Sequence, residues 1–137
     1  MVQRAILVIA VAACTVLRGS SQERPLVSFS EYSVRASAVR VVHPKYPPTA
    51  FRQHQTGVAV AQVYVNDDGA VEKVDLLQAP SEAIAASVRE ALKQWKFGPE
   101  LVTPGGEFTG KMTYYFVISR GKPAVFEPKY APYIGRW

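Results

Sequence analysis

Two runs in the middle of the chain have strand-like patterns of apolar and polar residues. Gly57 to Val65 is rich in β-branched residues and apolar on both faces, which predicts a central strand or one covered on both sides. Ala70 to Gln78 mixes apolar residues with Glu, Lys and Asp. Between them, Asn66-Asp67-Asp68-Gly69 is a strong turn signal, because Asn, Asp and Gly accept positive φ. The pattern predicts an antiparallel hairpin.

A run with helical spacing follows the hairpin. Pro80-Ser81-Glu82 marks its start, with Glu82 in the first turn, where a negative charge meets the positive end of the helix dipole. Ile84, Val88, Leu92 and Trp95 recur on one face, and Gly98-Pro99 ends the run. We expect one amphipathic helix that buries this face against the hairpin.

Phe108 to Ser119 has strand composition and predicts a third strand. One face carries Met112, Tyr114, Phe116 and Ile118, and the other carries Lys111, Thr113, Tyr115, Val117 and Ser119. The predicted fold class is therefore α+β: an antiparallel three-stranded sheet, in the order strand, turn, strand, helix, strand, packed against one main amphipathic helix. Pro47-Pro48 can open a short additional helix, from Pro48 to His54.

The flanks of this unit have weaker patterns. Residues 22–42 form a lead-in for which an extended or partly helical conformation is favoured. Residues 121–137 contain prolines and aromatic residues, and we expect this tail to be draped over the domain rather than regular. The domain itself is expected to span residues 43–120.

Residues 1–21 resemble an export signal. Arg4 provides a positive charge, and Ala5 to Leu17 is uncharged and apolar, shorter than the roughly 20 residues that a membrane-spanning helix needs. Three outcomes stay open: cleavage after small residues near Ser21, cleavage before an acylated Cys14, because Val11-Ala12-Ala13-Cys14 is similar to a lipoprotein signal, and a retained anchor. Cys14 is the only cysteine, so no intramolecular disulfide can form.

Composition limits the function classes. The 137 residues carry a net charge of +5, of which Arg4 and Arg18 lie in the signal-like segment. The remaining basic excess is small and spread along the chain, whereas nucleic-acid binders cluster Lys and Arg on one face. We therefore expect no nucleic-acid partner, and contact with a membrane only through an N-terminal anchor or lipid.

The sequence has no pattern of a catalytic or metal site. His43 and His54 are the only histidines and have no ligand set at zinc-site spacing. Asp67 and Asp68 are explained by the turn, and no serine lies in a nucleophile motif. We predict neither an enzyme nor a cofactor.

Several short motifs together resemble the C-terminal domain family of TonB, the periplasmic energy transducer of Gram-negative bacteria. They are Tyr46-Pro47 followed by Ala50, Gly57-Val58, Asp68-Gly69-Ala70-Val71, and Ala91 with Trp95-Lys96-Phe97 and Pro99. The resemblance covers about His43 to Arg120 and agrees with the predicted order of elements. It implies a chain that is exported to the periplasm.

The resemblance also implies a binding mode. In this family the domain binds a short extended peptide, the TonB box of an outer-membrane receptor, which adds to the sheet beside its last strand. An edge strand suits this role because its unpaired N–H and C=O groups can bond to a partner segment. The residues implicated here are His43, Pro44, Lys45 and Tyr46 before the domain, and Lys111, Thr113, Tyr115, Val117 and Ser119 on the last strand.

Two features depart from full TonB proteins: residues 1–21 contain no histidine, and no long proline-rich spacer precedes the domain. A stand-alone TonB-like module that binds an envelope protein is therefore favoured over a motor-coupled transducer. Two alternatives stay open, a full energy transducer for TonB-dependent transport and a structural envelope lipoprotein that dimerises through Lys111 to Ser119 without a peptide ligand.

Overall fold

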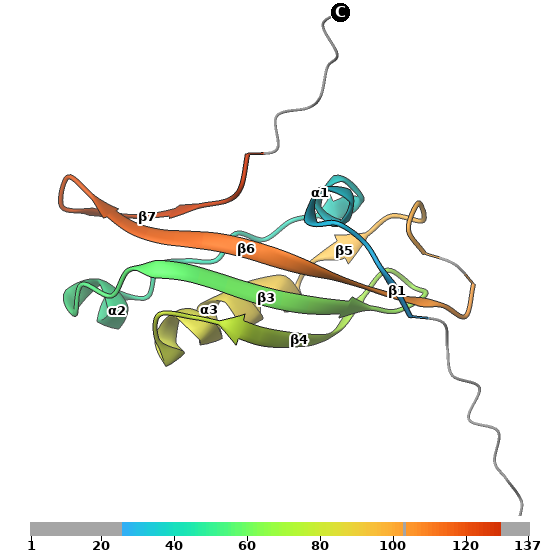
Figure 1. The fold of residues 1–137 in the computed structure, drawn as a ribbon, viewed down its shortest axis with the longest axis horizontal. Coiled ribbons are helices and arrows are strands. Elements are labelled where there is room, and N and C mark those ends of the chain that lie inside the picture. The colour runs from blue at the N-terminus through green and yellow to red at the C-terminus, as the bar shows by residue number, and fades with distance from the viewer. Residues whose placement is uncertain (1–25, 103, 130–137) are drawn as a thin grey trace, which may run out of the picture.

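The computed structural model describes residues 26–102 and 104–129, which form seven strands and three helices (Figure 1). In chain order these are β1 (Leu26–Ser28), α1 (Glu31–Ala36), β2 (Ala38–Arg40), α2 (Pro48–Arg52), β3 (Gly57–Val65), β4 (Val71–Gln78), α3 (Glu82–Lys93), β5 (Lys96–Phe97), β6 (Glu107–Ser119) and β7 (Lys122–Phe126).

The main sheet has five strands in the order β1-β6-β3-β4, with β7 also paired to β6. The three predicted strands β4, β3 and β6 are antiparallel neighbours, and the α+β class is confirmed. The prediction of a three-stranded, purely antiparallel sheet was nevertheless incomplete, because the sheet has five strands. The flanking segments add β1, which runs parallel to β6, and β7, which runs antiparallel to it. A separate two-stranded sheet joins β2 to β5.

The predicted turn connects β3 to β4. The Asn66 side-chain oxygen accepts hydrogen bonds from the N–H groups of Asp68 and Ala70, each at 3.0 Å. Gly69 has a φ of +79°, and a Cβ atom there would lie 2.2 Å from the Phe97 carbonyl oxygen. This turn therefore needs glycine both for its backbone conformation and for its contact with β5.

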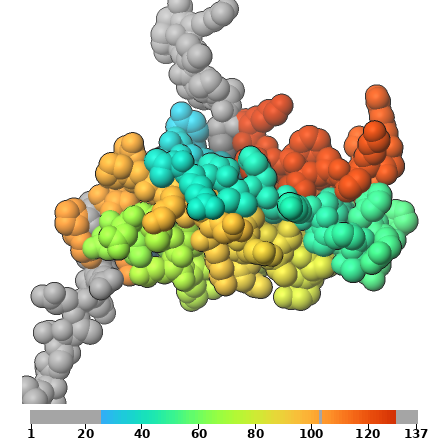
Figure 2. Space-filling model, turned by 180° about the vertical axis from the view of Figure 1, so that it is seen from behind, coloured from blue at the N-terminus to red at the C-terminus, as the bar shows by residue number. Residues whose placement is uncertain are grey.

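Helix α3 packs behind β3 and β4 in the view of Figure 1. It begins where the sequence predicts, because Ser81 caps the N–H of Ile84 at 3.2 Å. Ile84, Val88 and Leu92 are fully buried. The helix ends at Lys93, so Trp95 lies beyond it, yet Trp95 stays buried and donates its indole N–H to the Val42 carbonyl at 2.9 Å. The segment between β2 and α2 is thereby held alongside α3, on the face that Figure 2 shows.

The described part of the lead-in, residues 26–42, contains two short strands, β1 and β2, with helix α1 between them. Ser30 caps α1, and Val34 of this helix is fully buried against β6. Gly110 of β6 permits this contact, since a Cβ atom at that position would lie 2.5 Å from a Val34 methyl carbon. Helix α1 thus lies against the middle of β6.

The first part of the tail is regular, unlike the draped conformation that we expected. Arg120 and Gly121 have φ values of +52° and +73° and join β6 to β7 as a two-residue hairpin turn. Pro123 does not disrupt β7, because an outermost strand tolerates a residue without an N–H group. The predictions about Cys14 and residues 1–21, and the part of the predicted tail that includes residues 130–137, lie outside the described residues. Within the described part of the chain, no helix has the length and apolar character needed to cross a membrane.

Candidate functional site

The outer edge of β6, on the side away from β3, is the edge at which the family resemblance places a partner. Ser119 and Lys122 flank the two-residue turn and pair with each other. In an antiparallel ladder the residues whose backbone groups face one neighbour alternate with those that face the other. The backbone groups of every second residue before Ser119 therefore face the outer edge. These are Lys111, Thr113, Tyr115 and Val117, the residues that the sequence analysis implicates.

The chain itself occupies this edge at both ends. At one end β1 pairs with residues 107–109, and the N–H of Phe29 donates to the Thr109 carbonyl at 2.9 Å. At the other end β7 pairs with Tyr115 to Ser119. The edge that the sequence suggests is available is thus covered in this conformation, because the segments outside the predicted domain return to it.

Side chains of α1 cover the middle of the edge. Glu31 accepts hydrogen bonds from the N–H of Thr113 at 2.6 Å and from its hydroxyl at 2.9 Å. Arg35 donates from Nη2 to the Thr113 carbonyl at 2.9 Å. Both backbone groups of Thr113 are therefore satisfied by side chains, as a neighbouring strand would satisfy them.

Arg35 connects this edge to the end of β7. Its Nη1 lies 3.0 Å from Glu127 Oε2, and Glu127 Oε1 lies 2.8 Å from His43 Nδ1. The guanidinium also lies over the ring of Tyr114, at 5.1 Å from the ring centroid. His43, which the resemblance implicates, is thus brought to the β6 edge through Glu127.

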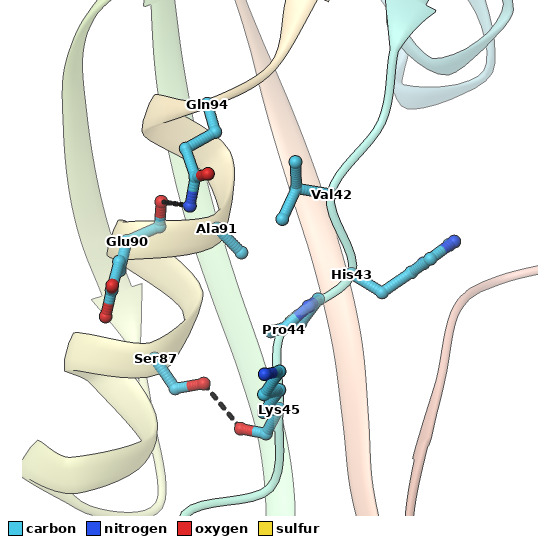
Figure 3. Close-up of a pocket in the computed structure, with 8 residues that line it drawn as sticks. All are labelled: Val42, His43, Pro44, Lys45, Ser87, Glu90, Ala91 and Gln94. Carbon is cyan, nitrogen blue, oxygen red and sulfur yellow. Dashed lines mark hydrogen bonds between the residues drawn. The ribbon is translucent and has the colours of Figure 1, made fainter.

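Pro44 and Lys45 occupy a different place. With Val42, Ser87, Glu90 and Ala91 they line an open groove of about 280 Å³ between the segment before α2 and α3 (Figure 3). The Ser87 hydroxyl donates to the Lys45 carbonyl. His43 and Gln94 also line the groove, although the His43 side chain extends away from α3. No residue of β6 lines the groove, so Pro44 and Lys45 are not combined with the strand into one site.

Tyr46 is a packing residue in this structure. Its ring lies 5.4 Å from that of Phe116 and 6.2 Å from that of Phe51, in both cases edge to face. Its hydroxyl donates to the Gln55 carbonyl, and burial raises the pKa of Tyr46 above its usual value. These contacts hold the start of α2 against β6.

Sequence reasoning missed three residues at the edge, namely Glu31, Arg35 and Glu127. The spacing of four between Glu31 and Arg35 is the signal for a helical ion pair and could have indicated them. No local signal indicates Glu127, since only the fold brings it to Arg35. Among residues 26–102 and 104–129, no group of three or more His, Cys, Asp or Glu side chains could hold a metal ion.

Comparisons with known proteins agree with this architecture. The sequence model of the family described as the Gram-negative bacterial TonB protein C-terminal matches residues 42–118. The protein TonB of Vibrio cholerae is 34% identical over 62 residues, which are 44% of this chain and 25% of that protein. The chain thus spans about a quarter of the length of that relative.

A solved structure shares the fold. The solution NMR structure of the Pseudomonas aeruginosa TonB C-terminal domain superposes with a TM-score of 0.50 at 24% identity, and the match covers 61% of this chain and 86% of that one. The family match extends over more than half of the chain and includes β6 except its last residue, but it leaves out β1, α1, β2 and β7. The chain therefore belongs to the TonB C-terminal domain family.

Proposed function

We propose that this chain is a periplasmic interaction module that binds an extended segment of an envelope or outer-membrane transport protein by adding it as a strand to β6. The observation that carries this proposal is the pairing of β7. An antiparallel strand already lies against Tyr115 to Ser119, so this stretch of β6 has the geometry to accept one. Family membership supports the same class of role.

Binding at this stretch takes the form of strand exchange. The main-chain hydrogen bonds that a partner gains replace those that β7 gives up, so they contribute little net free energy. Side-chain contacts of the partner therefore decide affinity and selectivity. The groove formed by Pro44, Lys45 and α3 is the place where a longer partner segment could make further contacts.

A peptide titration tests this function. A synthetic peptide from the periplasmic end of an outer-membrane receptor, containing its TonB box, is added to the ¹⁵N-labelled chain. We expect amide shifts to change mainly in Tyr115–Ser119 and Lys122–Phe126, as β7 gives way to the peptide. Unchanged spectra, or changes confined to α3 and β4, would contradict strand addition at β6.

The mass of the mature protein from its native host separates the role of an interaction module from that of a full energy transducer. A start near Gln22 indicates a secreted module, and an acylated Cys14 indicates a module held at a membrane by lipid. An intact Met1 or Val2 supports the transducer, because motor coupling needs a retained N-terminal helix. Our proposal predicts one of the first two masses.

A further inference from the structure

The guanidinium of Arg35 is held rigidly beside the β6 edge. Its Nε donates to Glu31 Oε1 at 3.0 Å, and its Nη2 donates to the Thr113 carbonyl at 2.9 Å. The side chain is only 12% exposed. Because Arg presents its donors in a fixed planar fork, these two contacts also fix the direction of the third nitrogen, Nη1.

That third nitrogen is an unsatisfied donor. Nη1 of Arg35 is buried and makes no hydrogen bond with good geometry to any described residue, although Glu127 Oε2 lies 3.0 Å away. A buried N–H group without an acceptor is costly, more so when it is charged. Nη1 thus marks a position where a well-placed carboxylate oxygen would be stabilising.

Glu127 reaches this position only because β7 is paired. Phe126 lies opposite Tyr115 at the end of the β6–β7 ladder, and Glu127 follows it directly. Its carboxylate lies between Arg35 on the buried side and His43, whose side chain is 73% exposed, on the solvent side. When β7 leaves, Glu127 leaves with it, and Arg35 keeps Glu31 as its only carboxylate partner among the described residues.

We propose that Arg35 and His43 form a carboxylate-binding site at the end of the exchangeable edge, and that the partner segment carries an acidic residue where β7 carries Glu127. This inference rests on the strand exchange proposed above. A partner without that carboxylate leaves a buried guanidinium short of an acceptor, whereas a partner with it restores the ion pair. Discrimination between the two follows from charge complementarity.

The β7 strand also indicates the residue that stands two positions before the acid. Val125 is partly buried and packs against the core, while Phe126 on the other face of the strand is 51% exposed. The preferred partner is therefore an extended segment, antiparallel to β6, with an apolar residue at the position of Val125, a variable one at that of Phe126, and an acidic one at that of Glu127.

The test uses the full chain with Ala124→Pro, which removes an N–H group from β7 and so weakens its hold on β6. Two fluorescein-labelled peptides are compared by anisotropy: Lys-Pro-Ala-Val-Phe-Glu-Pro, the sequence of β7 and the two residues after it, and the same peptide with Gln in place of Glu. We expect the Glu peptide to bind about tenfold more tightly. Arg35→Gln should remove most of this difference.

Each outcome decides between the two proposals. Equal binding of the Glu and Gln peptides overturns the carboxylate site but leaves strand exchange standing. Absence of binding by either peptide overturns strand exchange, and the carboxylate site with it. The unmodified chain with excess peptide is measured in parallel, in case Ala124→Pro does not fold. His43→Gln changes an exposed side chain and should reduce the difference between the peptides even if Arg35→Gln does not fold.

Discussion

At the scale of single residues, Tyr114 combines full burial with an unsatisfied hydroxyl. Its side chain lies under Arg35 in the core, and its OH makes no hydrogen bond of good geometry with a described residue, although the Arg35 guanidinium is close. Burial raises the pKa of Tyr114 far above its usual value, against an opposing effect of the Arg35 charge. The ring thus stabilises the core while the hydroxyl opposes folding.

Tyr114→Phe should raise the free energy of unfolding by about 1 kcal/mol at neutral pH, because it removes a buried polar group without a partner. The stabilisation by Tyr114→Phe should be larger at alkaline pH. The unfolded tyrosine loses its proton above its usual pKa of about 10 while the buried one keeps it, so stability falls as pH rises through this range. Urea unfolding should show a gap between variant and parent about 1 kcal/mol wider near pH 11 than near pH 8.

The neighbouring Tyr115 provides the control for this measurement. It lies on the same strand but is 41% exposed, and Tyr115→Phe should change stability by less than about 0.5 kcal/mol at either pH. A Tyr114→Phe variant that is less stable than the parent would show that its hydroxyl has a partner after all.

Glu31 holds α1 to β6. Glu31→Ala should cost about 2 kcal/mol or more, because it leaves the Thr113 N–H without its acceptor and removes one of the two carboxylates that pair with the Arg35 guanidinium. Glu82→Ala is the matched control: it lies in the first turn of α3, is 88% exposed and has one contact at 4.0 Å with Arg89. Its loss should stay within about 0.5 kcal/mol by urea unfolding. Equal losses would mean that the contacts of Glu31 contribute nothing specific.

At the scale of elements, the central unit was predictable and its surroundings were not. The β3–β4 hairpin, helix α3 and strand β6 each have a local signal, and each occurs within a few residues of its predicted bounds. Segments β1, α1 and β7 are short: β1 is defined by long-range pairing with β6, α1 packs against β6, and β7 follows β6 in a local hairpin that contains Pro123. A pattern read along the sequence does not contain the contacts of β1 and α1 with β6, so the covered edge and its Arg35–Glu127 contact emerge only in three dimensions.

The two hairpin turns of the main sheet depend on glycine to different degrees. Gly69 and Gly121 have similar positive φ values of +79° and +73°. A Cβ atom at Gly69 would overlap the Phe97 carbonyl, whereas one at Gly121 would meet nothing within 4 Å. Gly121→Ala should therefore cost about 1 kcal/mol for the backbone conformation alone, and Gly69→Ala about 2 to 3 kcal/mol or more.

Thermal or urea unfolding of both variants checks this difference. Because the two substitutions share the backbone cost, the extra loss at Gly69 measures the contact between the β3–β4 turn and β5. Similar losses of stability in the two variants would mean that the turn and β5 can move apart at little energetic cost.

At the scale of the whole molecule, the protein protects the edges of its sheet. Segments β1, α1 and β7 cover β6, and β4, the other terminal strand, carries the charged residues Glu72, Lys73 and Asp75 and has irregular register with β3. Charges and bulges at a sheet edge disfavour pairing between molecules. We therefore expect a monomer.

Sedimentation of the purified mature protein at several concentrations should give the mass of one chain throughout. Ala124→Pro, which exposes part of β6, is the informative comparison, because any self-association through that edge should increase in this variant. A dimer of the parent protein that forms with rising concentration would instead favour the structural alternative, in which pairing between copies replaces a peptide ligand.

Pro123 also affects the outer edge of the β6–β7 hairpin. Ser119 and Lys122 bond to each other, so the backbone of Pro123 faces away from β6, where proline has no N–H to offer. The strand that covers the edge therefore does not present a complete new edge of its own. While β7 is paired, this proline therefore disfavours growth of the sheet by pairing with a strand of another molecule.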